Sequence, residues 1–257
     1  MCEVQLAGSA VVITGAGNGI GAAMARKFSA LGAQVVLADV DTEGVQRVAA
    51  EVGGLAVPGD AASEDGVRTL VDAALTEHGR IDLFCANAGI SRGGGPEADE
   101  AAWADSWDVN VMAHVRAARA LLPHWLERGS GHFLATVSAA GLLTMLQAAP
   151  YSVTKHAALG FAEWLAITYA DKGITAQALC PQGVRTNMLG SSGQAGKTLL
   201  DDGALEPEQV ADLVADSLDS GEFLILPHPE VADYYALRAA QPQRWQAGMR
   251  KLQRKLG

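Results

Sequence analysis

Three residues in the middle of the chain have the types and the spacing for acid–base chemistry. Tyr151 and Lys155 lie four residues apart in the stretch YSVTKHAALGF, and Ser138 precedes Tyr151 by thirteen residues. Residues four apart share one face of a helix, and a cation beside a phenol favours the phenolate. Lys155 could therefore bring the pKa of Tyr151 down from about 10 toward the working pH, while Ser138 could hold a substrate oxygen. A Tyr–Lys pair also occurs by chance on many helices, so this interpretation needs support from the surrounding elements.

A glycine-rich turn near the N-terminus is typical of a dinucleotide site. The segment SAVVITGAGNGIGAAMARKFSALGA (9–33) predicts a buried strand, a turn with glycines at 15, 17, 19 and 21, and a helix. The glycines allow a tight turn and a close approach of the backbone to a ligand. The amides at the start of the helix would then face a pyrophosphate. The alternative is a tight turn that binds nothing.

The next strand, QVVLAD, ends on an acidic residue, Asp39. A carboxylate at this distance from the glycines can accept hydrogen bonds from the adenosine ribose hydroxyls. It would also repel the additional phosphate of NADP, and no Lys or Arg follows the turn glycines or stands at Val40 to offset it. The sequence therefore predicts NAD rather than NADP. The alternative is that Asp39 caps the following helix, a role for which Asp41 and Thr42 compete.

Strand and helix patterns alternate along the whole chain. The expected strands are 10–14, 34–39, 54–58, 81–86, 131–137, 174–180 and 222–226, with helices between them. This order predicts one α/β domain over residues 1–257, a Rossmann-type, doubly wound parallel sheet with helices on both faces. Ligands of such sheets gather at the carboxyl ends of the strands. Several of the polar residues and glycines singled out in this subsection follow directly after expected strands.

Further motifs follow the glycine turn in a specific order. They are Asp60 with Ala61, Asn87-Ala88-Gly89, Asn110, Ser138 with Tyr151 and Lys155, and Thr186. Together with TGAGNGIG at 14–21, this set resembles the compact, non-extended branch of the short-chain dehydrogenase/reductase family. The resemblance covers residues 6–190. Each motif alone is weakly specific, but the complete series in this order is strongly specific.

The resemblance implies a role for each matching residue. Tyr151 is expected to exchange a proton with the substrate, and Lys155 to hold the nicotinamide ribose and lower the pKa of Tyr151. Ser138 is expected to position the substrate oxygen, and Asn110 to hold a water in the proton path. The implied cofactor contacts are Gly15, Asn18, Gly19, Ile20, Gly21, Asp39, Asp60, Ala61, Asn87, Ala88, Gly89, Tyr151, Lys155, Pro181, Val184 and Thr186. The expected substrate contacts are Ser138, Tyr151, Gln182 and Met188.

The chain departs from the family pattern at two places. The family usually has Pro-Gly after the sixth strand, whereas this chain has Pro181-Gln182-Gly183. Gln182 either contacts the substrate or points outward, and its side chain in place of glycine bears on the backbone path at Pro181 and Val184. The usual glycine-rich C-terminal strand is replaced by a segment expected to be a helical tail at 229–257, with an amphipathic helix over 245–256. That helix either packs on the domain or a partner subunit, or binds a membrane.

The segment at 187–204 corresponds to the family's substrate loop. Met188 there, and Leu142, Leu143 and Met145 between Ser138 and Tyr151, either line an apolar substrate pocket or belong to the core. An apolar lining favours a hydrophobic, medium-sized secondary alcohol or ketone. The glycine-rich loop 91–100 beside the site is expected to be a surface loop rather than a lid.

Composition narrows the possible partners. The formal charge of −10 argues against nucleic acid or an anionic membrane as the main partner. The three cysteines and six histidines show no metal-ligand spacing, so no metal is expected. No signal peptide or membrane-length apolar run is apparent, which predicts a cytoplasmic protein. Apolar faces around 103–122 and 152–169, with the family's habit of pairing long helices, predict a homodimer or homotetramer.

Taken together, these features predict an oxidoreductase that transfers a hydride between NAD and a secondary alcohol or ketone, with a Tyr-Lys-Ser-Asn tetrad. Two alternatives remain at this point. One is a non-catalytic dinucleotide-binding sensor that kept the fold, and the other is an epimerase or dehydratase that uses the same tetrad. The sequence does not identify the substrate, the stereochemistry or the direction of the reaction.

Overall fold

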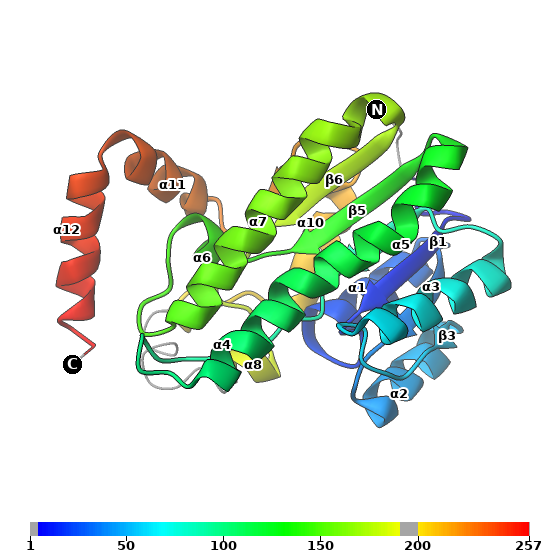
Figure 1. Cartoon of the computed structure of the whole chain (residues 1–257), viewed down its shortest axis with the longest axis horizontal. Coiled ribbons are helices and arrows are strands. Elements are labelled where there is room, and N and C mark those ends of the chain that lie inside the picture. Colours follow the sequence, from blue (N-terminus) through cyan, green and yellow to red (C-terminus); the bar gives the residue numbers. More distant parts are fainter. Residues whose placement is uncertain (1–4, 191–199, 257) are drawn as a thin grey trace.

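A computed structural model describes residues 5–190 and 200–256 of the chain (Figure 1). Its strands are β1 (Ala10–Thr14), β2 (Gln34–Ala38), β3 (Leu55–Ala56), β4 (Leu83–Ala86), β5 (Gly131–Thr136), β6 (Ile174–Leu179) and β7 (Leu224–Ile225). All neighbouring strands pair in parallel, in the order β3-β2-β1-β4-β5-β6-β7. The strand order reverses between β1 and β4: β2 and β3 lie on one side of β1, and β4 to β7 lie on the other. This reversal is expected for a doubly wound sheet. The predicted fold class is confirmed.

Helices cover both faces of this sheet (Figure 1). They are α1 (Gly19–Ala30), α2 (Thr42–Val52), α3 (Glu64–His78), α4 (Glu100–Trp107), α5 (Ala113–Arg128), α6 (Ala139–Leu142), α7 (Ala149–Tyr169), α8 (Asn187–Gly190), α10 (Pro207–Ser217), α11 (Glu230–Ala240) and α12 (Pro242–Gln253). A π-helical turn, Asp108–Met112, joins α4 to α5, and a 3₁₀ turn, Ala170–Lys172, follows α7. The strand expected at 10–14 agrees, those expected at 34–39, 131–137 and 174–180 each end one residue earlier, and the one expected at 81–86 begins at Leu83. The strands expected at 54–58 and 222–226 are shorter, because each lies at an edge and pairs on one side only.

Each face of the sheet has its own apolar core, and the alternation of side chains along the strands separates the two. In β1, Val12 faces the core formed with α3, α5 and α7, whereas Val11 and Ile13 face the core formed with α1, α2 and α10. Both cores consist mainly of aliphatic and alanine side chains. This packing fixes the long helices beside the central strands. It therefore also fixes the side chains that these helices direct toward the carboxyl ends of the strands.

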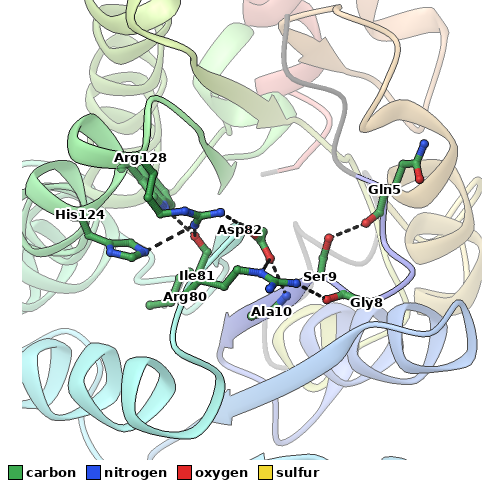
Figure 2. Close-up of polar contacts among 10 residues, drawn as sticks. Gln5, Gly8, Ser9, Ala10, Arg80, Ile81, Asp82, His124 and Arg128 are labelled. Atoms are coloured by element: carbon green, nitrogen blue, oxygen red, sulfur yellow. Dashed lines mark hydrogen bonds and ion pairs between the residues drawn. The ribbon is translucent and has the colours of Figure 1, made fainter.

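The opposite, amino end of the sheet is held by a polar cluster around Asp82 (Figure 2). Its carboxylate accepts hydrogen bonds from the Ala10 amide at 2.9 Å, from Arg80 at 2.9 Å and from Arg128 at 2.7 Å. Burial raises the pKa of Asp82, but these three donors outweigh burial and leave the pKa below its usual value. The cluster joins the starts of β1 and β4, far from the end where the candidate site lies.

The C-terminal tail is helical, as expected, and lies at one end of the molecule beyond α6 (Figure 1). Pro242 begins α12, so the tail consists of two helices, and α12 ends at Gln253 rather than at 256. Trp245 packs against Tyr234 of α11, with ring centroids 6.4 Å apart. Met249 on the same face is half-buried, whereas the basic side chains of α12 are exposed. The predicted amphipathic pattern is therefore present.

Candidate active site

The glycine turn lies between β1 and α1, and steric limits explain its composition. Gly15 and Gly19 have positive φ values of 65° and 54°, which side-chain-bearing residues rarely adopt. A Cβ on Gly15 would lie 2.9 Å from the Cα of Ala88, and one on Gly21 would lie 2.1 Å from the carbonyl oxygen of Gly15. Asn18 precedes α1 in an extended conformation and does not cap the helix with its side chain. The first amides of α1 thus face the carboxyl end of the sheet without a side-chain cap, as a pyrophosphate site requires.

Asp39 lies one residue beyond β2 and holds this turn in place. Its Oδ2 accepts a hydrogen bond from the Gly17 amide at 2.8 Å, and its Oδ1 accepts one from the Asp41 amide at 2.9 Å. The capping residue of α2 is Asp41, which accepts a bond from the Gly44 amide at 3.0 Å. The alternative in which Asp39 caps the helix is therefore wrong, and its carboxylate stands at the turn.

A cation that was not predicted from the sequence lies at the same turn. Arg47, on α2, donates a hydrogen bond to the Gly17 carbonyl at 3.3 Å. Gly17 therefore binds Asp39 through its amide and Arg47 through its carbonyl. No motif marks Arg47, because its approach depends on how α2 packs beside the turn.

The residues expected beside the adenine follow β3. The Gly59 amide donates to the Asp39 carbonyl at 2.9 Å, which brings the end of β3 next to Asp39. The exposed Asp60 accepts a bond from the Ala62 amide at 3.0 Å, and Ala61 between them is buried. Asp60 and Ala61 therefore lie on the same edge of the sheet as Asp39, as predicted.

Asn87, after β4, connects three strands through its side chain. Its Nδ2 donates to the carbonyls of Thr14 at 3.0 Å and Gly15 at 3.3 Å, and its Oδ1 accepts from Thr136 at 3.0 Å. The amides of Asn87 and Ala88 both donate to the Thr14 hydroxyl at 3.0 Å. The side chain of Asn87 thus orders the carboxyl ends of β1, β4 and β5.

Gly89 lies where the dinucleotide end of the site meets the candidate tetrad. A Cβ at Gly89 would lie 3.3 Å from both the Oδ1 of Asn110 and the Nζ of Lys155. The segment that follows β4 is therefore directly adjacent to two of the four residues of the candidate tetrad.

The π-helical turn directs Asn110 into the protein, where it is fully buried. Its Oδ1 accepts from the Ile90 amide at 2.9 Å, and its Nδ2 donates to the Ile90 carbonyl at 2.9 Å and to the Thr154 hydroxyl at 3.1 Å. Both amide hydrogens are used in these bonds. Asn110 thus joins the segment after β4 to α7, one residue before Lys155. Thr154 was not identified from the sequence, because a threonine inside a helix gives no functional signal.

Ser138, Tyr151 and Lys155 meet at the ends of β5 and β6. Ser138 begins α6, accepts a bond from the Ala140 amide at 3.1 Å and lies 3.5 Å from the Pro181 carbonyl. Tyr151 and Lys155 lie in the first two turns of α7, and the Nζ of Lys155 is 5.7 Å from the centre of the Tyr151 ring. Lys155 is only 3% exposed and donates to the Thr136 carbonyl at 2.9 Å. The three residues predicted to act together are therefore adjacent.

The electrostatics at these residues correct one expectation. Burial raises the pKa of Tyr151, and a hydrogen bond with Ser138 only partly opposes this effect. Burial also lowers the pKa of Lys155 to about 8, because the ammonium is removed from water without an acidic partner. The expected lowering of the Tyr151 pKa by Lys155 is therefore not observed. Desolvation has the largest effect on the pKa of both groups.

The loop after β6 closes the site from the other side. Pro181 and Val184 are buried, and the Pro181 carbonyl accepts a bond from the Ala139 amide at 2.8 Å, next to Ser138. A Cβ on Gly19 would lie 3.0 Å from the Cγ2 of Thr186, so Thr186 packs against the glycine turn. A cavity of about 380 Å³ opens there, lined in part by Gly19, Thr186 and Leu189.

The residues expected to contact a substrate lie in different surroundings. The side chain of Gln182 donates to Glu230 of α11 at 3.3 Å, and Met188 on α8 is 37% exposed. Leu142 and Leu143 belong to the core, which settles the alternative for these two, whereas Met145 is half-buried. The part of the expected substrate loop at 191–199 lies outside the described residues.

Two hydrogen-bonded contacts beside the site were also not predicted. The hydroxyl of Ser152 bonds the amide of Met145 at 2.9 Å and its carbonyl at 3.0 Å. In the loop 91–100, the Gly94 amide donates to Gln147 at 2.9 Å, and Gly94 accepts from Ala149 at 2.8 Å. These two hydrogen bonds hold the glycine-rich loop against the start of α7.

Two searches of the described residues bear on other kinds of site. In the chain at 5–190 and 200–256, no three His, Cys, Asp or Glu side chains come together in a way that could hold a metal ion. Within the same residues, no helix combines the length and the apolar character needed to cross a bilayer.

Comparison with known proteins agrees with this geometry. Residues 9–196 match the family model described as short chain dehydrogenase. The 1-deoxy-11-beta-hydroxypentalenate dehydrogenase of Streptomyces exfoliatus is 34% identical over 86% of this chain and 83% of its own. The meso-2,3-butanediol dehydrogenase of Serratia marcescens is 35% identical over 80% of this chain and 85% of its own.

A solved structure shares the whole architecture. It is a short chain dehydrogenase/reductase from Burkholderia phymatum in complex with NAD, with a TM-score of 0.87 and 30% identity. The alignment covers 93% of this chain and 96% of the Burkholderia chain. The chain therefore belongs to the short-chain dehydrogenase/reductase family of oxidoreductases.

Proposed function

We propose that the protein uses NAD to interconvert a secondary alcohol and a ketone, with Tyr151, Lys155, Ser138 and Asn110 as its catalytic tetrad. The observation that carries the proposal is the buried Lys155 beside Tyr151, adjacent to Gly89 and thus to the dinucleotide end of the site. A buried lysine without an acidic partner is costly. Such a group beside a phenol is typical of a functional site.

Bound nicotinamide would supply hydride transfer. The glycine turn fits the dinucleotide, since its amides face the site and a Cβ at Gly15 or Gly21 would collide with neighbouring backbone. Tyr151 exchanges the proton: its protonated phenol donates to the substrate oxygen during carbonyl reduction and recovers the proton during alcohol oxidation. The Ser138 hydroxyl holds that oxygen. Lys155 places its ammonium beside the phenol, and Asn110 fixes α7 through Thr154.

The preference for NAD rests on Asp39. Its carboxylate is held at the glycine turn by two backbone amides, in the position expected to meet the adenosine ribose. A 2′-phosphate there would face this negative charge. Arg47 binds the carbonyl of the same residue, Gly17, and its positive charge weakens the discrimination. We infer a preference for NAD with measurable use of NADP.

The substrate is inferred to be a largely apolar, medium-sized alcohol or ketone. Met145 is half-buried and Met188 is exposed near the site. The relatives named for hydroxypentalenate and butanediol are both dehydrogenases of hydroxyl-bearing compounds.

The protein is also inferred to be a homodimer or homotetramer. α7 exposes Val153, Trp164 and Ile167 at 47%, 52% and 77%, and α4 exposes Trp107 at 46%. Large apolar side chains exposed together on adjacent helices are typical of subunit contacts.

The replacement Tyr151→Phe tests the catalytic proposal. Turnover is followed by NADH absorbance with a panel of secondary alcohols and ketones, and NADH binding by the fluorescence of the coenzyme. We expect the variant to lose at least about a hundredfold in kcat, because it cannot exchange the proton. NADH affinity should change by less than about threefold, since the phenyl ring keeps the packing. Turnover equal to that of the unmodified protein would reject the role of Tyr151.

A further inference from the structure

His228 is a buried histidine outside the candidate tetrad, between β7 and α11, and only 5% of it is exposed. Its Nδ1 lies 3.1 Å from the backbone nitrogen of Gln182, and its Nε2 lies 3.1 Å from the carbonyl oxygen of Gly203. A backbone amide can only donate and a carbonyl can only accept. The ring is therefore the neutral tautomer with its hydrogen on Nε2. Both nitrogens are used, which accounts for a histidine at a buried position.

These two bonds connect segments that are remote in the sequence. Gln182 lies in the loop after β6, between Pro181 and Val184. Gly203 begins the segment 203–205, which pairs with the same loop. The Leu205 amide donates to the Gly183 carbonyl at 3.0 Å, and the Arg185 amide donates to the Leu205 carbonyl at 2.9 Å. His228 thus joins both sides of this pairing to the end of the sheet.

The same loop departs from the family's pattern at Gln182. Among the described residues other than glycine, only Thr144 and Gln147 have positive φ values, so Gln182 does not need the conformational freedom of glycine. The loop path is instead held by the Gln182 amide on His228, whereas the Gln182 side chain makes an exposed contact to Glu230. Beyond the loop, Thr186 packs against Gly19 of the glycine turn.

We propose that His228 is a positioning residue for the dinucleotide: through the Gln182 amide it fixes the 181–184 loop, and thereby sets Val184 and Thr186 against the cofactor. This role rests on the proposed function. In this role the backbone amide of Gln182, rather than its side chain, connects the loop to the segment that leads into α11.

Two isosteric replacements separate the two bonds of His228. In His228→Asn, the Oδ1 of asparagine takes the place of Nδ1 and can still accept from Gln182. In His228→Gln, the Nε2 of glutamine takes the place of the ring Nε2 and can still donate to Gly203. His228→Leu removes both bonds. Glu230→Ala is the matched control, because it removes only the contact to the Gln182 side chain.

NADH binding is measured for each variant by titration of coenzyme fluorescence, which does not require turnover, and the melting temperature of each variant is recorded beside it. We expect His228→Asn and Glu230→Ala to bind NADH within about threefold of the unmodified protein. His228→Gln should bind about tenfold more weakly, because the buried Gln182 amide loses its acceptor. His228→Leu should be at least as weak.

The outcomes distinguish this role from the proposed function. NADH binding by the unmodified protein, with equal affinities in His228→Asn and His228→Gln, would overturn the role of His228 and leave the function standing. If His228→Leu does not fold, the comparison of His228→Asn with His228→Gln still tests the positioning role of His228. Absence of NADH binding by the unmodified protein would reject the proposed function, and the role of His228 with it.

Discussion

Replacement of Asn87 probes how strongly the carboxyl end of the sheet is organised by one side chain. Asn87→Ala removes three hydrogen bonds, to Thr14, Gly15 and Thr136. Each neutral hydrogen bond contributes about 0.5–1.5 kcal/mol, so their loss should lower the free energy of unfolding by about 3 kcal/mol. For a chain of this size, that corresponds to a fall in Tm of roughly 6–12 °C.

Asn87→Asp distinguishes hydrogen bonding from shape. The aspartate is isosteric and can still accept from Thr136, but its second oxygen would face the carbonyls of Thr14 and Gly15, which cannot donate. We expect it to be destabilised at neutral pH by about as much as Asn87→Ala, on the order of 3 kcal/mol. Part of the stability should return in acid, where the protonated carboxyl can donate one bond.

Urea denaturation followed by circular dichroism, at a fixed protein concentration, measures these differences. Asn18→Ala is the control, because Asn18 is exposed and does not cap α1 with its side chain. Its unfolding free energy should change by less than about 0.5 kcal/mol. An Asn87→Asp variant as stable as the unmodified protein at pH 7 would refute the reasoning, since shape alone would then be sufficient at this position.

Three other predictions concern the cofactor, the buried lysine and the subunit contacts. Asp39→Ala should lower the ratio of kcat/KM for NAD over NADP by about tenfold or more, because it removes a charge that repels the 2′-phosphate; an unchanged ratio would remove the basis of the NAD preference. Burial lowers the pKa of Lys155 from 10.5 to about 8, so between these values the unfolded chain binds more protons than the folded one. The unfolding free energy should therefore rise with pH across that window relative to Lys155→Met, and parallel pH profiles would contradict the lowered pKa. The double replacement of Trp164 and Ile167 by Glu should yield monomers by light scattering, whereas an unmodified protein that is itself monomeric would exclude the proposed assembly.

Much of the site was predictable because its signals are local. The glycine turn is marked by consecutive glycines between a strand and a helix, and the backbone positions of Gly15 and Gly21 leave no room for a side chain. Tyr151 and Lys155 share the first two turns of one helix, so their spacing alone places them together. The position of Asp39 at the end of β2 follows in the same way from the alternation of strand and helix.

Contacts between segments remote in the sequence were not predictable. The bond of Asn110 to Thr154 spans 44 residues, and that of His228 to Gln182 spans 46. Arg47 reaches the glycine turn only because α2 packs beside it. No periodicity or motif records these pairs, since each depends on how several elements pack at once.

By itself, the sequence determined the α/β fold, the family and the identity of the residues at the site, because these follow from periodicity and from the spacing of short motifs. Only the tertiary structure determined how burial shifts their pKa values and which remote residues hold them in place. Burial raises the pKa of the Tyr151 phenol and lowers the pKa of the Lys155 ammonium, and the extent of burial is set by elements that pack against α7 from distant parts of the chain. A pKa reports an environment, and that environment exists only after the chain has folded.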